Sequence, residues 1–394
     1  MKTHTVTAIE ENDTEMVVQI ERLGSRRLRC SRCGRSCRRV HSRAVKQRSW
    51  RDLPLRKARL VLRYRPRRVH CERCGVRTEA LPWAEPWARV SCALAASVAA
   101  LTKHLSWREA AHHFDLNWKT VAAIVQRAVA YGLARRRRKP LHWIGIDEVS
   151  RRKGHRYLTV VYDLERRTLL WVGEDRSEPT LRKFFSALGR GRCQTIQVVL
   201  MDMWAPYAKA VRENAPRAQV LFDRFHLVQH LNRAVDEVRR SQMRHLSRKE
   251  KVKFKRTRYL LLKNPWNLRP DQKERLSTLV SWNTPITRAY YLKESLQLFF
   301  DYKQPKRARE HLERWMHSAM RSRLEPFKKL VKMLRSHLDG VLAWTRLRLT
   351  NGAVEGMNNK IKLVSHRAYG FRTVEHYVAA IYHCCARLPL PEES

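Results

Sequence analysis

Apolar and polar residues alternate over the first part of the chain, a pattern typical of strands that bury one face. Met16, Val18 and Ile20 follow this period within residues 1–29, which predicts a strand or a hairpin there. Residues 58–64 repeat it, with aliphatic side chains facing one way and arginines the other. We therefore expect β-structure on both sides of residue 50.

The pattern then changes to helical spacing. Residues 92–101 are rich in alanine and predict one helix, and Ser106 and Glu109 are spaced as a capping box that begins a second. A third helix is expected from Trp118 to about Gly132, a glycine that suits a C-cap. Helix, short turn and helix resemble a helix-turn-helix, whose second helix would enter the major groove of DNA. The alternative is a plain three-helix packing unit.

Under the helix-turn-helix interpretation, the residues expected to reach base edges are Trp118, Lys119 and Thr120, at the start of the third helix. Trp118 is ambiguous, because a tryptophan at this position could equally be a core residue.

From Leu141 the chain again predicts strands. The stretch LHWIGIDEV reads as a strand that ends on Asp147, and the run before Asp202 reads as another. The remaining elements are expected as strands at 157–162, 168–172 and 219–222 and as helices at 178–188 and 207–214. Three strands, a helix, and then alternating strands and helices match the connectivity of an RNase H-like domain. Such a domain places one carboxylate on its central first strand and a second at the end of its fourth.

Beyond His226 the chain is predicted to be helical and strongly basic. Apolar residues at helical spacing mark three helices whose stripes are core packing: Val228, Leu231, Val235 and Val238; Leu312, Trp315, Met316 and Ala319; Phe327, Leu330, Val331, Leu334 and Leu338. The opposite faces carry lysine and arginine and could form a DNA channel.

The last polar helix begins near Glu355. Asn358, Asn359 and Lys362 follow Glu355 at i+3, i+4 and i+7, which predicts one shared face. A carboxylate, two amides and a lysine on one face suit a metal-bound phosphate. A solvated polar face without a ligand is the plain alternative.

The composition adds a strong positive charge. Lys and Arg total 82 against 36 Asp and Glu, a formal net charge of +46. A field of this sign attracts polyanions and predicts salt-dependent phosphate binding, although a ribosomal or chromatin-type protein would share it. With 43% hydrophobic residues and 12 Trp, the chain is expected to form real cores. No apolar run is long enough to cross a bilayer, and no signal peptide is indicated.

The densest charge run lies in the segment 135–140, where Pro140 follows Arg135, Arg136, Arg137, Arg138 and Lys139. We expect a linker that follows a phosphate backbone, although a solvated charge run is the ordinary reading of such segments.

Four cysteines are spaced for a metal ion. Cys30 and Cys33 form one CxxC pair, Cys71 and Cys74 form another, and a glycine follows each pair and permits a tight turn. Zn²⁺ prefers four such ligands, and a site without an open position is structural. A hairpin would explain the long gap between the pairs. Cys37 complicates the choice of ligands, and a metal-free thiol cluster is the alternative.

Three carboxylates in separate predicted elements, Asp147, Asp202 and Glu355, suggest metal-ion chemistry on nucleic acid. Mg²⁺, or Mn²⁺ in its place, prefers carboxylate oxygens and keeps positions open for phosphate. Phosphodiester cleavage and strand transfer need no covalent protein intermediate, because two such ions can activate the attacking oxygen and stabilise the leaving one.

Four blocks of the sequence resemble DDE transposases of the ISL-three insertion-sequence family: IGIDEVSRRKGHRYLTVVYDLE, VLMDMWAPYAKAV, LFDRFHLVQHLNRAVDEVRR and TNGAVEGMNNKIKLVSHRAYGFR. The CSRCG and HCERCG knuckles and the helix-turn-helix resemble the zinc and DNA-binding regions of that family. The resemblance covers nearly the whole chain.

The resemblance implies that Asp147, Asp202 and Glu355 are the catalytic triad. It also implies that the N-terminal modules recognise terminal inverted repeats. Asp223 and His226 match a family block, and they would either support the carboxylates or contact the scissile phosphate. An RNase H-like core whose carboxylates are inactive, in a regulator, is the alternative.

The expected fold is therefore multi-domain α/β, with a four-cysteine zinc-binding domain, a helix-turn-helix and an RNase H-like catalytic core with a large helical insertion. The expected ranges are 1–88 for the zinc domain, 89–134 for the helix-turn-helix, 135–140 for the linker, 141–240 and 346–394 for the two parts of the core, and 241–345 for the insertion.

The resemblance implies a bacterial transposase of the cytoplasm and nucleoid that acts on double-stranded DNA, and no membrane partner is expected. A homodimer on DNA is predicted from the mechanism, because two element ends must be held together. The competing hypothesis is a zinc and helix-turn-helix DNA-binding regulator without catalysis. An RNase H-like nuclease for RNA or hybrids is disfavoured by the two modules expected to read duplex DNA.

Overall fold

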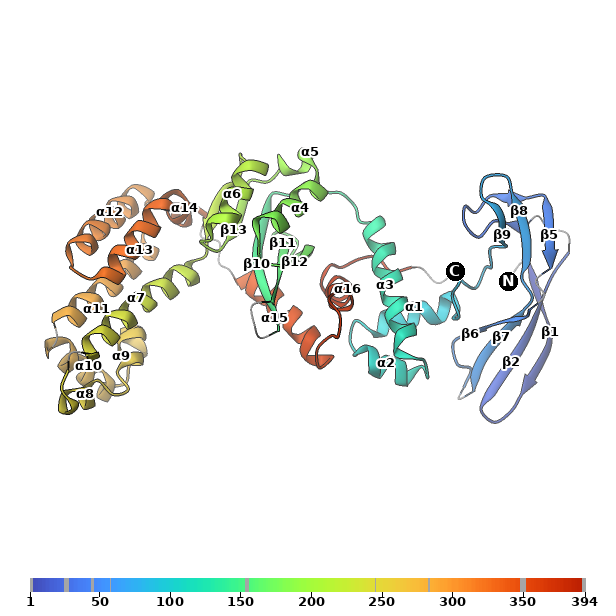
Figure 1. Cartoon of the computed structure of the whole chain (residues 1–394), viewed down its shortest axis with the longest axis horizontal. Helices are drawn as coiled ribbons and strands as arrows, with labels where there is room; N and C mark the ends of the chain where they lie inside the picture. Colours follow the sequence, from blue (N-terminus) through green and yellow to red (C-terminus); the bar gives the residue numbers. More distant parts are fainter. Residues whose placement is uncertain are drawn as a thin grey trace. The chain divides into compact units, whose positions relative to one another are not determined.

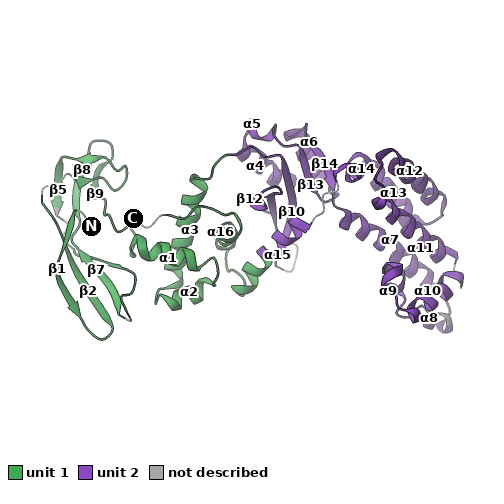
Figure 2. Cartoon of the chain, turned by 180° about the vertical axis from the view of Figure 1, so that it is seen from behind, with its two compact units in different colours: residues 1–138, 361–394 green, residues 139–360 purple. Residues whose placement is uncertain are grey.

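The computed structural model describes residues 3–24, 28–43, 46–56, 58–152, 156–244, 246–282, 284–347 and 352–391 (Figure 1). The chain forms two compact units, Met1–Arg138 with Ile361–Ser394 and Lys139–Lys360 (Figure 2). The C-terminal residues thus belong to the same unit as the N-terminal ones, and the six domain ranges expected from the sequence stay a prediction.

The first unit begins with the hairpin that alternation predicts, β1 (His4–Glu11) and β2 (Glu15–Arg22). These strands join β6 (Arg48–Arg51) and β7 (Arg59–Tyr64) in a sheet of order β1-β2-β7-β6. The alternating apolar positions bury one core, formed by Val18, Ile20, Trp50, Leu62, Tyr64, Trp83 and Ala84.

Short strands surround the cysteine pairs. They are β3 (Leu28–Arg29) with β4 (Ser36–Cys37), and β5 (Arg39–Arg43), β8 (Arg67–Cys71) and β9 (Gly75–Thr78). β6 and β7 pair antiparallel between the two cysteine pairs, so the expected hairpin does fill the gap.

Three helices follow: α1 (Cys92–Leu101), α2 (Trp107–His113) and α3 (Trp118–Ala134). The capping box is confirmed, since the Ser106 hydroxyl accepts from the Glu109 amide and the Glu109 carboxylate accepts from the Ser106 amide. Asn117 caps α3, because its side chain accepts a hydrogen bond from the Lys119 amide at 2.9 Å.

Gly132 was predicted to end the third helix, and this prediction is wrong. α3 continues to Ala134 and Gly132 is buried within it. A Cβ at this position would lie 2.6 Å from Leu388 Cβ and 2.9 Å from the Pro389 carbonyl oxygen. The glycine therefore allows the C-terminal segment to cross α3 closely.

The C-terminal helix α16 (Val374–Cys385) packs against α3 in the same unit. The His383 Nε2 atom lies 2.7 Å from the Ala99 carbonyl, which can only accept, so Nε2 carries the proton. Burial lowers the pKa of His383 to about 4, and the ring is neutral at pH 7.

The second unit contains a five-stranded sheet of order β12-β11-β10-β13-β14. Its strands are β10 (Trp143–Arg152), β11 (Arg156–Asp163), β12 (Thr168–Glu174), β13 (Val198–Met201) and β14 (Gln219–Phe222). β10, β11 and β12 pair antiparallel, whereas β10, β13 and β14 run parallel. This order matches the RNase H-like connectivity that the sequence predicts.

Helices α4 (Glu178–Leu188), α5 (Arg190–Cys193) and α6 (Ala205–Asn214) connect these strands. The long α7 (Arg224–Arg244) leads from β14 into the helical insertion. The insertion contains α8 (Arg248–Phe254), α9 (Arg258–Leu262), α10 (Pro270–Trp282), α11 (Thr284–Gln297), α12 (Pro305–Arg321), α13 (Glu325–Ser336) and α14 (Leu338–Leu347), with short 3-10 turns at Pro265–Asn267 and Leu298–Asp301.

The predicted apolar stripes are buried, with two differences. On α7, Val228 is half-buried and Leu227 is buried in its place. α13 ends at Ser336, so Leu338 begins α14 rather than extending the stripe of Phe327. α14 returns to the sheet, where Gly340 lies against the Phe222 ring of β14 and leaves no room for a Cβ. None of the helices that the structure describes is long and apolar enough to span a membrane.

Candidate active site and DNA-binding elements

Asp147 lies within β10, where the strand loses one of its two neighbours. The parallel pairing with β13 stops at Gly145 and Leu200, whereas the antiparallel pairing with β11 continues to Arg152. The expectation that the strand ends on Asp147 is therefore wrong, because β10 continues to Arg152. Only its pairing with β13 ends near Asp147. The carboxylate lies just past the end of the parallel pairing.

Asp202 and Asp223 each follow directly after a parallel strand. Met201 of β13 is paired with Phe222 of β14, so the next residue of each strand emerges at the same edge of the sheet. Asp223 also precedes α7 and accepts a hydrogen bond from the Phe225 amide at 3.0 Å, as an N-cap does.

This cap places His226 in the first turn of α7. Its Nε2 atom lies 2.8 Å from Asp202 Oδ1 and 3.9 Å from Asp223 Oδ2. The three side chains offer ligand atoms that all lie within 4.8 Å of one another. The hydrogen bond to Asp202 is the main cause that raises the pKa of His226 above its usual value.

Both oxygens of Asp147 accept hydrogen bonds. The Glu148 amide donates to Oδ1 at 2.7 Å, and the Asn358 side-chain amide donates to Oδ2 at 2.6 Å. The pKa of Asp147 is nevertheless raised to about 6, first by burial and then by the neighbouring charge of Asp202. A cation near Asp147 and Asp202 would offset the effect of the Asp202 charge on Asp147.

Asn358 belongs to α15 (Gly352–Arg367), and its side chain is buried with an exposed fraction of 8%. The predicted face that it shares with Glu355 and Lys362 is therefore wrong. Asn358 lies with Val354 and Ile361 on the buried stripe, at i−4 and i+3, because its amide has polar partners inside the core. Its Oδ1 atom accepts a hydrogen bond of 2.5 Å from the Tyr162 hydroxyl.

Glu355, Asn359 and Lys362 are exposed on α15. Among the described residues, no hydrogen bond or ion pair holds the Glu355 carboxylate, and the cluster around His226 does not include it. Glu355 precedes Asn358 by three residues, and side chains at this spacing lie about 5–6 Å apart at their Cβ atoms. The structure thus brings Asp147, Asp202, Asp223, His226 and Asn358 together, and it leaves Glu355 about one helical turn away.

Glu148 is a further carboxylate next to Asp147 on β10. Strand alternation turns its side chain to the face opposite to Asp147, where it forms an ion pair of 2.7 Å with Arg176. Arg176 in turn stacks over the Trp204 ring at 4.7 Å. Burial raises the pKa of Glu148 to about 7, against the opposing effect of Arg176. No spacing in the sequence links Arg176 to Glu148, although the carboxylate pair Asp147-Glu148 was a visible signal.

The four cysteines predicted to bind metal converge. The sulfur atoms of Cys30, Cys33, Cys71 and Cys74 lie within 4.8 Å of one another. Gly34 and Gly75 have φ angles of 72° and 70°, so both turns use the left-handed region that glycine allows. Cys37 is buried nearby but lies outside this group of ligand atoms.

The proposed base-contacting residues lie at the exposed start of α3. Trp118 has an exposed fraction of 42% and meets the His376 ring edge-on at 6.0 Å between centroids. Lys119 is exposed and Thr120 is half-buried. In the linker, Arg135 lies 3.7 Å from the centroid of the Tyr131 ring, and the boundary between the two compact units falls after Arg138.

Comparison with known proteins decides the family. The model of the ISL3 DDE domain, described as "Transposase", matches residues 144–381, which is more than half of the chain. A second model, described as the helix-turn-helix domain of transposase family ISL3, matches residues 79–129. The chain belongs to the ISL3 family of transposases. Its DDE catalytic domain lies in residues 144–381. The helix-turn-helix prediction is confirmed, and the alternative of a plain three-helix packing unit is wrong.

Two curated relatives agree with this assignment. The transposase for insertion sequence element IS1001 of Bordetella parapertussis is 35% identical over 356 residues, which cover 89% of this chain and 87% of the relative. The transposase for insertion sequence element IS1557 of Mycobacterium tuberculosis is 32% identical over 375 residues, which cover 89% and 84%. The similarity thus extends over nearly the full length of both chains.

Proposed function

We propose that this transposase binds the terminal inverted repeats of an insertion sequence, cleaves phosphodiester bonds with Mg²⁺ or Mn²⁺, and joins the freed 3′-hydroxyl to target DNA. The catalytic residues in this proposal are Asp147, Asp202 and Glu355. The observation that carries this proposal is that Asp147 and Asp202 lie close together at the edge of the sheet where the parallel pairing ends. They are close enough for the charge of Asp202 to raise the pKa of Asp147.

The residues at this edge fit a hard divalent cation. All the candidate ligands on β10, β13 and α15 are carboxylates, the donors that Mg²⁺ prefers. The ion would supply Lewis acidity to the phosphate and a lowered pKa to the attacking water or hydroxyl. Asp147 and Asp202 would hold it, and the two hydrogen bonds on Asp147 orient that carboxylate.

Glu355 is proposed as the third ligand because Asn358 anchors its helix directly to Asp147. The glutamate is free of other partners among the described residues, so a rotamer change can turn it toward the edge of the sheet. His226 would hold Asp202 in place through its 2.8 Å contact, and Asp223 would fix the first turn of α7 that carries His226. Asn359 and Lys362, exposed on the same helix, are proposed to contact the phosphate.

DNA recognition is proposed for the N-terminal unit. The start of α3, with Trp118, Lys119 and Thr120, would read bases in the major groove. The cations of the linker, Arg135 to Lys139, would follow the phosphate backbone, and all of them but the half-buried Arg136 are exposed. A Zn²⁺ ion at the four cysteines would hold the N-terminal strands together without an open position for catalysis.

Two element ends must be joined to one target, so we propose that the protein acts as a homodimer on DNA. The complex with end DNA would contain two chains when its mass is measured by light scattering. A complex that stays at one chain per DNA end while it is active would contradict this assembly.

The proposed activity is tested by excision from a donor plasmid that carries the element's own ends. Wild type is compared with Asp147→Asn, Asp202→Asn and Glu355→Gln at matched expression. Glu310→Gln, at an exposed carboxylate of α12, is the matched control. Excision by wild type and the control alone supports the triad.

The other outcomes each change one part of the proposal. Excision that survives only Glu355→Gln would remove Glu355 from the site and leave the two aspartates. Absence of excision in every protein, with end binding intact, would favour a DNA-binding regulator. Equal excision in every protein would place the metal site on other residues.

A further inference from the structure

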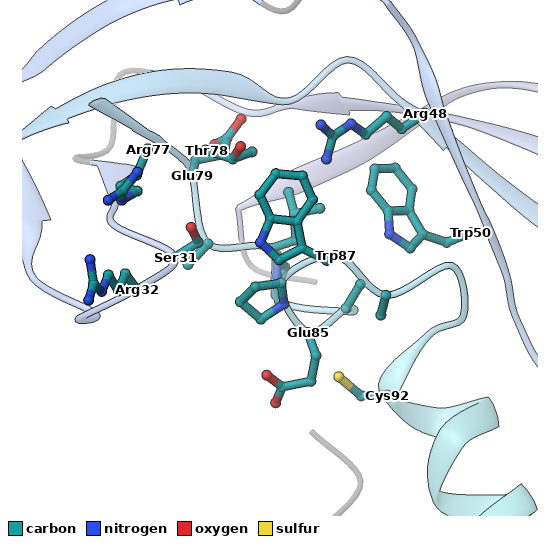
Figure 3. Close-up of a pocket in the computed structure, with 16 residues that line it drawn as sticks. Ser31, Arg32, Arg48, Trp50, Arg77, Thr78, Glu79, Glu85, Trp87 and Cys92 are labelled. Atoms are coloured by element: carbon teal, nitrogen blue, oxygen red, sulfur yellow. The ribbon is translucent and has the colours of Figure 1, made fainter. Parts of the chain in front are cut away.

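A hollow of about 670 Å³ opens in the first unit, whereas the carboxylates Asp147 and Asp202 belong to the second (Figure 3). It lies between the first cysteine knuckle, β6, β9 and the segment 79–88 that leads to α1. Its volume is within the range of pockets that enclose a ligand of nucleotide size. In Figure 3, Trp87 occupies the middle, with Arg48 on one side and Arg32 and Arg77 on the other.

Trp87 is unusual in both exposure and backbone. Its exposed fraction is 83%, whereas the core residues Trp50 and Trp83 are at 3% and 5%. Its φ angle is 66°, in the left-handed region where a bulky side chain is an outlier. Such a conformation costs free energy and persists where the surrounding structure determines it, commonly at a binding site. The exposed indole therefore contributes little apolar burial to folding, whereas a ligand that covered it would bury a large apolar surface.

The charges around Trp87 favour an anion. Arg32, Arg48 and Arg77 come from three different segments of the chain and line the same hollow. The Arg48 guanidinium lies 5.6 Å from the centroid of the Trp87 ring. Arg32 stands between the ligand candidates Cys30 and Cys33, so a metal ion at the knuckle would fix the backbone that carries it.

The buried carboxylate at the hollow does not oppose an anion. Glu79 accepts hydrogen bonds from the Tyr64 hydroxyl at 2.8 Å, from the Arg67 amide at 2.6 Å and from Arg22 at 3.2 Å. Its charge is thus already compensated within the fold. Glu85, at the rim, is exposed to solvent, where its charge is screened.

We propose that this hollow binds one unstacked nucleotide of a DNA strand, with the base on Trp87 and the flanking phosphates on Arg32, Arg48 and Arg77. Base stacking on an aromatic ring is tolerant of sequence, and arginine pairs with phosphate in a bidentate geometry. A base inside a duplex cannot reach the indole face without leaving its stack. The inference rests on the proposed function, because that function supplies the DNA whose strands separate at the cut ends.

The test uses the full-length zinc-loaded protein and a fluorescein-labelled oligothymidine of about 15 nucleotides, followed by anisotropy. Trp87→Ala is expected to weaken binding about tenfold, and Trp87→Phe to retain most of it, because a phenyl ring also stacks. The side chain is exposed, so neither change threatens the fold, and thermal unfolding checks this. A duplex of the same length is expected to respond much less to Trp87→Ala.

The arginines are tested through salt dependence. Replacing both Arg32 and Arg77 by Gln is expected to reduce the slope of log affinity against log salt by about 1.4 for a single strand. Arg73→Gln is the matched control, since Arg73 lies between Cys71 and Cys74, is exposed, and does not line the hollow. It is expected to change the slope by much less than the double variant does.

Equal oligothymidine binding by wild type, Trp87→Ala and Trp87→Phe would overturn the proposal. So would a loss of self-association in Trp87→Ala with unchanged DNA binding, which would assign the hollow to a protein segment. Excision by wild type, measured beside oligonucleotide binding, separates this inference from the proposed function. Strand binding that depends on Trp87, in a wild-type protein that shows no excision, would leave the hollow assigned and the catalytic proposal refuted.

Discussion

Asn358 donates a hydrogen bond of 2.6 Å to Asp147, a residue 211 positions earlier in the chain. The same amide accepts a 2.5 Å hydrogen bond from the Tyr162 hydroxyl through its oxygen. The ionised Asp147 carboxylate can only accept, so the Asn358 NH2 group faces it and the Asn358 oxygen is left to accept from Tyr162. One side chain thus joins α15, β10 and β11 at the carboxylate site.

Asn358→Ala is expected to lower excision activity by roughly 10- to 100-fold, as is common when the support of a metal ligand is removed. It also removes the hydrogen bond that the buried Tyr162 hydroxyl donates to Asn358, which is expected to cost about 0.5–1.5 kcal/mol of unfolding free energy. Excision and urea unfolding of the same preparations measure the two effects.

Tyr162→Phe separates these two effects, because it removes the hydroxyl and keeps the Asn358 bond to Asp147. It is expected to affect activity much less than Asn358→Ala does. Equal activity in Asn358→Ala and wild type, at limiting Mg²⁺, would show that this amide does not support Asp147 in catalysis.

A second prediction follows from the raised pKa of Asp147. The pKa of Asp147 is about 6 in the folded protein and near 4 in the unfolded chain. Between about pH 4 and pH 6 the folded protein therefore holds a proton that the unfolded chain has lost. The contribution of this group to stability is therefore greatest below about pH 4 and is lost as the pH rises to about 6. The loss is at most about 3 kcal/mol, because one pKa unit corresponds to about 1.4 kcal/mol.

Asp147→Asn removes this ionisation, although an asparagine can accept only one of the two hydrogen bonds on Asp147. In magnesium-free buffer, the stability of the variant relative to wild type is therefore expected to be higher at about pH 7.5 than at about pH 5. Added Mg²⁺ is expected to stabilise wild type and to have little effect on the variant. Thermal unfolding under the four conditions measures this. A difference in stability between variant and wild type that is the same at both pH values would contradict the assigned shift.

The strands and helices follow from the sequence because most of them bury a single face. Alternation at Met16, Val18 and Ile20 placed β2 correctly, and the order of the elements after Leu141 gave the topology of the central sheet. Gly132 was misjudged because the sequence does not show that Leu388 crosses α3 at that point. Close packing between distant segments leaves no local signal.

The candidate site shows the same limit. Asp202 and Asp223 were visible as carboxylates directly after apolar strands, and the parallel register brings them to one edge. The spacing predicts that Asn358 shares a polar face with Glu355 and Lys362, yet its partners Tyr162 and Asp147 lie in other elements and hold it in the core. A buried hydrogen-bond network can reverse the rule that polar residues face water.

A third prediction concerns the four-cysteine cluster. Cys71→Ser is expected to lose bound zinc and to lower the stability of the N-terminal strands, because Cys71 belongs to the group of four sulfur atoms. Cys37→Ala is the matched control, since Cys37 is buried in the same hydrophobic cluster but outside the ligand group. Zinc released under denaturing conditions is measured with a chromogenic chelator. Loss of zinc from Cys37→Ala, with retention in Cys71→Ser, would exchange their roles.

The last prediction tests how the C-terminus packs on α3. An alanine at position 132 gains helix propensity of about 1 kcal/mol over glycine. Its Cβ would, however, lie 2.6 Å from Leu388 Cβ and 2.9 Å from the Pro389 carbonyl oxygen, and the backbone atom cannot turn away. Overpacking of this kind costs about 1–3 kcal/mol, so Gly132→Ala is expected to lower the unfolding free energy or leave no gain.

Gly356→Ala is the comparison, because Gly356 is exposed on α15 and nothing lies within 4 Å of its added Cβ. This variant is expected to gain about 0.5–1 kcal/mol from the loss of backbone freedom in the unfolded chain. Urea unfolding of both full-length variants decides the matter. Both glycines lie within helices, and they differ in that only Gly132 has close neighbours, Leu388 and Pro389. If the two substitutions stabilised the protein equally, the C-terminal segment could not cross α3 at Gly132.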